Sequence, residues 1–185
     1  MTRRTGRIET DGVGSTVEAG VRPAASAAVV PLVVLDTNVV LDWLLFDDRR
    51  CEALARAIVD ARVHWIATAA MRGELAHVLA SGRIRGRWPG DAASTLRGWD
   101  RWARVLEPPP AAPTVPRCTD ADDQIFIDLA LGARAHALLS RDRAVLKLAR
   151  RTAPRGLAIM IPERWSAPPF EPPALAGSTA LDRGS

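Results

Sequence analysis

Five acidic side chains occupy positions from which they could act together on a metal ion. They are Asp36, Glu74, Asp120, Asp123 and Asp142. Asp36 ends the apolar run Val33–Leu35, and Asp142 follows the apolar stretch Ala135–Ser140, so we expect both at the carboxyl ends of strands. Carboxylate oxygens suit Mg²⁺ or Mn²⁺ rather than zinc. The pattern therefore predicts a hard-metal site at one edge of a parallel sheet.

A cluster of carboxylates needs its charge compensated. Two carboxylates about 4 Å apart repel by roughly 4 kcal/mol at an effective dielectric of 20, whereas a whole domain is stable by only about 5–15 kcal/mol. A divalent cation removes this repulsion and can also activate water for in-line attack on a phosphate ester. The predicted chemistry is therefore metal-dependent hydrolysis, provided that the carboxylates converge.

Each acidic residue also has a purely structural explanation. Asp36 and Asp142 each precede a helical pattern, where an aspartate can start a helix. The run Asp120–Asp123 suits the positive end of a helix dipole. Glu74 could pair with a basic side chain nearby. These alternatives stay open at the level of sequence.

The elements that must position these residues alternate between strand and helix patterns. This rhythm predicts an α/β fold, a three-layer α/β/α sandwich around a central parallel sheet. Strands are predicted at 33–35, 63–67, 104–106, 135–140 and 156–162. The first helix is predicted to run to 45 with Thr37 or Asn38 as its cap. Further helices are predicted through 54–59, at 69–80 with Thr68 as the cap, at 92–103, at 119–132 and at 144–150.

Length and composition limit the domain organisation and the location of the protein. The chain has 185 residues, from which we predict a disordered extension at 1–30, one folded domain at 31–163 and a flexible Pro/Gly-rich tail at 164–185. Two cysteines are too few for a disulfide framework, and no apolar run approaches the roughly 20 residues of a membrane span. We therefore expect a cytoplasmic protein with no membrane association.

Basic residues gather in two windows of a chain whose formal net charge is +4. The first holds Arg83, Arg85, Arg87, Arg97, Arg101 and Arg104, and the second Arg141, Arg143, Lys147, Arg150, Arg151 and Arg155. Such clusters attract phosphate backbones, although a solvated face explains them as well. Beside an acidic metal site, they indicate phosphodiester chemistry.

Four short motifs in order resemble the acidic motifs of PIN domains. They are Leu35-Asp36-Thr37-Asn38, Arg72-Gly73-Glu74-Leu75, Asp120-Ala121-Asp122-Asp123-Gln124 and Ser140-Arg141-Asp142-Arg143. The resemblance covers about residues 32 to 162 and is greatest to bacterial toxins of toxin–antitoxin pairs, the VapC-like ribonucleases. It implies the same three-layer fold and an Mg²⁺- or Mn²⁺-dependent endoribonuclease.

The resemblance also implies roles for individual residues and partners. Asp36, Glu74, Asp123 and Asp142 would be catalytic metal ligands, with Asp120 as a further candidate and Asp122 as the alternative to it. Asn38 and Ser140 would supply hydrogen bonds that orient these ligands. The implied partners are an RNA substrate, a cognate antitoxin protein and a second copy in a homodimer.

Two other functions remain as alternatives. One is a PIN-like module that binds RNA or protein without cutting it. The other is a haloacid-dehalogenase-like phosphatase, which also begins with a strand-end aspartate. That chemistry needs a second carboxylate two residues later, and the chain has Asn38 there.

Overall fold

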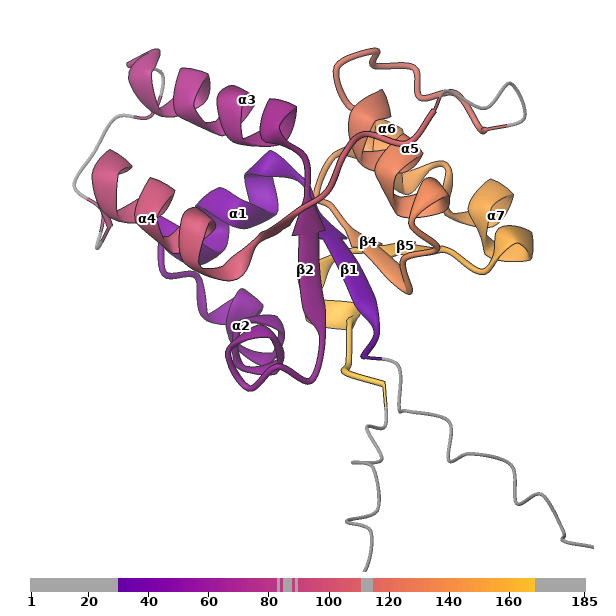
Figure 1. Ribbon diagram of the computed structural model, residues 1–185, viewed down its shortest axis with the longest axis horizontal. Coiled ribbons are helices and arrows are strands. Elements are labelled where there is room, and N and C mark those ends of the chain that lie inside the picture. The colour runs from indigo at the N-terminus through magenta and orange to yellow at the C-terminus, as the bar shows by residue number, and fades with distance from the viewer. Residues whose placement is uncertain (1–29, 83, 85–87, 89, 111–114, 169–185) are drawn as a thin grey trace, which may run out of the picture.

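A parallel sheet with the strand order β3-β2-β1-β4-β5 runs through the centre of the protein (Figure 1). The computed structural model describes residues 30–82, 84, 88, 90–110 and 115–168. Its strands there are β1 (Leu32–Leu35), β2 (His64–Ala67), β3 (Arg104–Val105), β4 (Ala137–Leu139) and β5 (Ala158–Met160), each parallel to its neighbours. The predicted extension at 1–30, except for Val30, most of the predicted tail at 164–185, and Arg83, Arg85 and Arg87 lie outside the described residues.

Helices cover both faces of this sheet. On one side lie α1 (Thr37–Leu44), α2 (Glu52–Val59), α3 (Ala69–Ala80) and α4 (Ala92–Trp102), with the 3₁₀ turn η1 (Arg49–Cys51) between α1 and α2. On the other lie α5 (Gln124–Gly132), α6 (Arg143–Leu146) and α7 (Ala149–Thr152), followed by η2 (Ala153–Arg155), and η3 (Pro162–Arg164) follows β5. Figure 1 shows the first group to the left of β1 and β2 and the second to the right. The predicted three-layer α/β/α sandwich is confirmed.

The core fills the space between the sheet and both helical layers. Val33 and Val34 in β1 and Leu138 in β4 are fully inaccessible, as expected for strands covered on both faces. Fully burying one such side chain contributes about 1.5–3 kcal/mol. The core continues to Trp165, which is only 5% exposed and lies two residues beyond the predicted end of the domain.

The strand order puts the chain's change of direction between β1 and β4. From β1 the chain moves outward through β2 to β3, then crosses back to β4 and continues to β5 on the opposite side. Ligands of open α/β sheets bind at such a switch point, outside the carboxyl ends of the strands. Asp36 follows β1 and Ser140 follows β4, so the predicted site residues flank this point.

Three local predictions differ from the structure. Asp36, not Thr37 or Asn38, is the N-cap of α1 because its side chain accepts the N–H groups of Asn38 and Val39. The run 119–123 forms a turn rather than the start of a helix, since an Asp120 carboxylate oxygen accepts the Asp122 N–H at 3.0 Å and so competes with helical bonding. The helix predicted at 144–150 is two short helices, α6 and α7.

Candidate active site

Asp36 is held in the switch point by three hydrogen bonds. Its Oδ1 accepts the backbone N–H groups of Asn38 at 2.7 Å and Val39 at 3.1 Å, and its Oδ2 accepts the hydroxyl of Ser140. Only 2% of the residue is exposed. Burial raises the pKa of Asp36, and the charge of Asp142 adds to this, whereas the three hydrogen bonds lower it. Asp36 is thus both a helix cap and a buried carboxyl with a fixed orientation.

Ser140 connects Asp36 to the turn that carries Asp142. Ser140 is fully buried, and its Oγ also accepts the backbone N–H of Asp142 at 2.9 Å. Asp142 in turn caps α6 by accepting the N–H of Ala144 at 2.5 Å through Oδ1. The predicted contact of Ser140 with a site carboxylate is therefore present. Asn38 contacts Asp36 only through its backbone N–H, and the residue is exposed.

Glu74 reaches the site from α3 and is oriented by Thr37. The Thr37 hydroxyl donates to Glu74 Oε1 at 2.9 Å. Burial raises the pKa of Glu74, whereas the hydrogen bond from Thr37 lowers it. The charges of Asp36, Asp122 and Asp120 raise this pKa further. Arg72, the nearest basic residue in the sequence, forms a two-point ion pair with Asp100 rather than with Glu74. Thr37 was missed by the sequence analysis as a site residue; its place directly after the strand-end aspartate was the available signal.

Asp123 is the least compensated carboxylate of the set. It stands at the N-cap position of α5, yet its side chain accepts no capping hydrogen bond. Burial, followed by the charges of Asp142, Asp120, Asp36 and Glu74, raises the pKa of Asp123 to about 7. All five predicted carboxylates are therefore close enough to interact electrostatically, although they come from four separate segments of the chain.

The five carboxylates are suitable ligands for a hard divalent cation, but their side chains do not converge on one position. Carboxylates are the ligands that Mg²⁺ and Mn²⁺ prefer. Among the described residues, however, no three His, Cys, Asp or Glu side chains are arranged so that they could hold a metal ion. In this arrangement Asp36 and Asp142 each direct an oxygen toward backbone N–H groups at the start of a helix. Metal binding requires these side chains to draw together.

An ion cluster on the other side of the same turn fixes Arg141. Its guanidinium donates to Asp42 in α1 and, at 2.7 Å, to Glu163 in η3, and it lies 3.8 Å from Asp48. Although burial disfavours the charge, the bonds to Asp42 and Glu163 raise the pKa of Arg141. The residue between Ser140 and Asp142 therefore ties the turn to α1 and to the end of the domain.

An open depression of about 700 Å³ joins the acidic set to basic side chains. Its lining includes the carboxylates of Asp120 and Asp142 and the cations of Arg143 and Lys147, together with Thr119, Ala121 and Ala144. Both signs of charge therefore meet in one solvent-accessible hollow.

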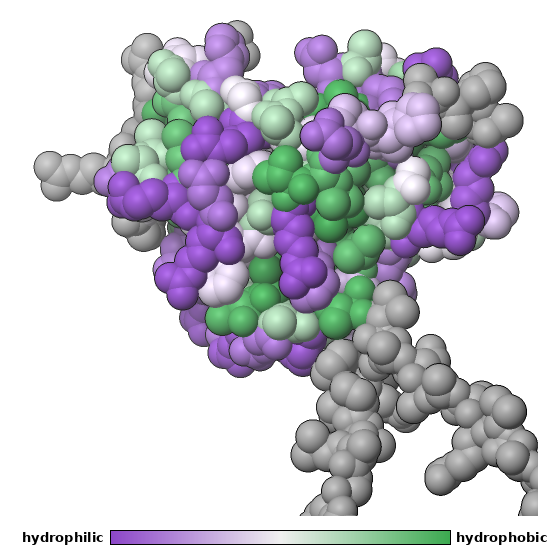
Figure 2. All heavy atoms as spheres, in the orientation of Figure 1, coloured by the Kyte–Doolittle hydropathy of each residue, from purple (hydrophilic) through white to green (hydrophobic). Residues whose placement is uncertain are grey.

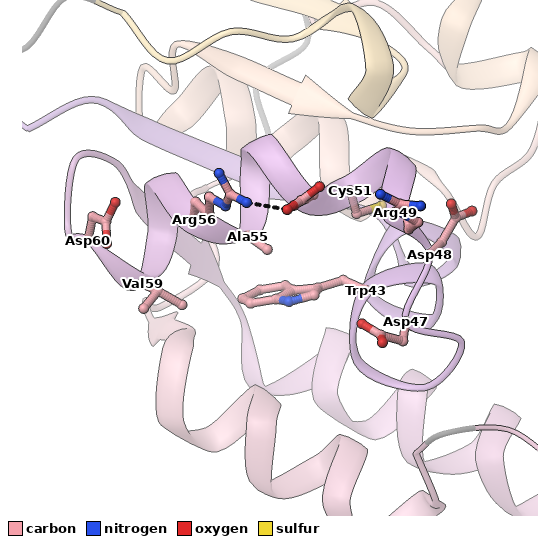
Figure 3. Close-up of a pocket in the computed structure, with 10 residues that line it drawn as sticks. Trp43, Asp47, Asp48, Arg49, Cys51, Ala55, Arg56, Val59 and Asp60 are labelled. Atoms are coloured by element: carbon pink, nitrogen blue, oxygen red, sulfur yellow. Dashed lines mark hydrogen bonds and ion pairs between the residues drawn. The ribbon is translucent and has the colours of Figure 1, made fainter.

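A second pocket, of about 380 Å³, lies elsewhere and includes none of the predicted carboxylates. The Trp43 indole extends beneath α2 alongside Ala55 and Val59 (Figure 3). Cys51 also lines this pocket, and burial raises the pKa of its thiol to about 11, so the thiol stays protonated near neutral pH. The pocket therefore offers no activated nucleophile.

The protein is thus an α/β domain whose candidate site is a set of carboxylates at the carboxyl edge of a parallel sheet. The chain belongs to the PIN domain family, whose model matches residues 32–144. The matched range contains all five predicted carboxylates. No curated protein and no solved structure matches the chain significantly.

PIN domains are generally nucleases and usually use a divalent metal. Membership of the family therefore gives a nuclease-type fold to this chain. None of the helices in the described part of the chain is long and apolar enough to cross a membrane.

Proposed function

We propose that this protein is an Mg²⁺- or Mn²⁺-dependent endoribonuclease and the toxin of a toxin–antitoxin pair. The observation that carries the proposal is Asp123, a half-buried carboxylate with no capping bond and four like charges around it. A structural role would give this side chain a partner, and it has none among the described residues. A divalent cation bound by the set would supply the missing positive charge.

The residues proposed to hold the metal are Asp36, Glu74, Asp123 and Asp142, with Asp120 as a further candidate. A bound ion would activate water and stabilise charge on the phosphate. The protein's own contribution is to orient the ligands: Ser140 and two backbone N–H groups hold Asp36, and Thr37 holds Glu74. Partners of this kind typically change metal affinity or activity 10–100-fold.

The two alternatives are less consistent with these contacts. A haloacid-dehalogenase-like phosphatase needs a second carboxylate two residues after its nucleophile, whereas Asn38 stands there and its side chain is exposed. A module that binds RNA without cutting has no need of uncompensated carboxylates beside its phosphate-binding surface, since these repel RNA.

The proposed partners and location follow from the resemblance of the motifs to VapC-like toxins. We expect a cognate antitoxin that covers the acidic site, a homodimer, and action on RNA in the cytoplasm. Cys51 and Cys118 are unpaired, as a reducing compartment would keep them.

Cleavage of RNA by the purified full chain tests the proposal. Wild type is expected to cut single-stranded RNA with Mg²⁺ or Mn²⁺ and to stop in EDTA. Asp36→Asn keeps the shape and the acceptor for the two capping N–H groups but removes the charge and the acceptor for the Ser140 hydroxyl. We therefore expect at least 100-fold slower cleavage by a variant that still unfolds cooperatively. Asp60→Asn, an exposed aspartate beyond α2, is the matched control. Equal cleavage by Asp36→Asn and wild type would overturn the assignment.

The toxin role needs a separate measurement in cells. Expression of wild type is expected to arrest growth, and co-expression of the neighbouring open reading frame to relieve it. If cells grow normally although their extracts cleave RNA fully, the protein is a ribonuclease and the proposed toxin role is wrong.

A further inference from the structure

The segment from α6 to α7 presents a row of basic side chains that begins in the depression of the acidic site. Arg143 and Lys147 line that depression together with Asp120 and Asp142. Arg150 and Arg151 continue along α7, and all four basic residues are exposed. We call these four residues the α6–α7 track.

The track is a consequence of how this segment packs. Val145, Leu148 and Thr152 are buried and fix its inner face against the sheet. Lys147 and Leu148, which join α6 to α7, both have right-handed helical backbone angles. Arg143, Lys147 and Arg150, at intervals of four and three residues, therefore lie on about the same face of the segment. That face points away from the buried one. Figure 2 accordingly shows hydrophilic side chains gathered at the right of the molecule, where Figure 1 places α7.

The four track cations have no acidic partner within the part of the chain that the structure describes. None of them forms an ion pair with a described residue, whereas Arg50, Arg56 and Arg72 each pair with an acidic neighbour at the surface. Arg143 and Lys147 remain unpaired even though they share a depression with two aspartates. The charge of the track is therefore available to an external anion.

We infer that the α6–α7 track binds consecutive phosphates of a single-stranded RNA on one side of the bond to be cut. This inference rests on the proposed function and adds the path that the strand takes from the acidic site.

Salt-dependent binding of a labelled twelve-nucleotide oligouridine in EDTA tests the track without cleavage. Each lost phosphate contact lowers the slope of log affinity against log salt by about 0.7 for a single strand. Arg143→Gln/Lys147→Gln should therefore reduce the slope by about 1.4. Over the decade from 1 M to 0.1 M salt this amounts to about 25-fold weaker binding at 0.1 M.

The control variant Arg49→Gln/Arg97→Gln removes the same charge from exposed residues on the other side of the sheet. It should change binding by less than threefold, and both variants should melt like wild type. Equal losses in the two double variants would overturn the track, because net charge alone would then explain binding. The track is assigned to single-stranded RNA. Tighter binding of an RNA duplex, or displacement of the oligouridine by polyglutamate as effectively as by unlabelled oligouridine, would overturn that assignment.

The same proteins separate this inference from the proposed function. If wild type cuts RNA with Mn²⁺ but Arg143→Gln/Lys147→Gln binds like the control, the nuclease stands and the track is wrong. If wild type never cuts but only the track variant loses binding, the track stands and the nuclease is wrong.

Discussion

Replacing Asp123 by Asn should stabilise the metal-free protein near neutral pH and leave its stability at acidic pH unchanged. Asn keeps the size of the side chain and removes the charge that Asp142, Asp120, Asp36 and Glu74 oppose. At about pH 4 the wild-type carboxyl is already protonated in the folded protein, so the two proteins should have the same free energy of unfolding.

The sign and size follow from the raised pKa. Because the pKa of Asp123 is about 7 in the folded protein and 3.8 ordinarily, the folded state binds this proton more tightly than the unfolded chain. Its contribution to stability is complete below pH 3.8 and is lost as the pH rises through about 7. The difference corresponds to about 4 kcal/mol. Since the side chain is partly exposed, solvent screening reduces the expected effect to about 2 kcal/mol.

Urea unfolding in EDTA, followed by the fluorescence of the buried Trp65 and Trp99, measures this effect between pH 4 and pH 8. The pKa of His64, lowered by burial, also acts in this range, but it cancels when the two proteins are compared. Mn²⁺ should stabilise wild type at pH 7.5 and have little effect on the variant. Parallel pH curves for wild type and Asp123→Asn would refute the reasoning.

Three further substitutions test contacts around the site. Thr37→Val removes the hydroxyl that orients Glu74 and should weaken Mn²⁺ binding about tenfold by calorimetry, whereas Thr37→Ser should bind like wild type. Arg141→Gln leaves Asp42 without its cation and should lower the free energy of unfolding by about 2 kcal/mol, less than a fully buried pair because the side chain is 22% exposed. Trp165→Ala should cost about 3–5 kcal/mol in urea, and a cost below 1 kcal/mol would exclude Trp165 from the core.

The layers of the fold were predictable because local patterns encode them. The apolar runs before Asp36 and Asp142 are strands buried on both faces, and the helix at 69–80 begins at its Thr68 cap as expected. The order of the strands was not predictable in this way, since it depends on pairings between segments more than 100 residues apart, such as Val33 with Ala137.

The acidic residues were predictable individually, but their contacts were not. Strand ends and helix starts mark where carboxylates gather, whereas the bond from Thr37 to Glu74 joins residues 37 positions apart. The link from Arg141 to Asp42 spans 99 positions, and its sequence neighbours give no sign of it. The turn at 120–123 was missed because a side-chain acceptor replaced the helical pattern.

The hydroxyl of Ser140 has one proton, and that proton points toward Asp36. Its oxygen accepts the Asp142 N–H, so the hydrogen bonds run in one direction, from the Asp142 N–H through Ser140 to the Asp36 carboxylate. A serine committed in this way has no proton to give and no free approach for a substrate. Ser140 is therefore a structural bridge that holds Asp36 and the turn of Asp142 together and is not itself a nucleophile.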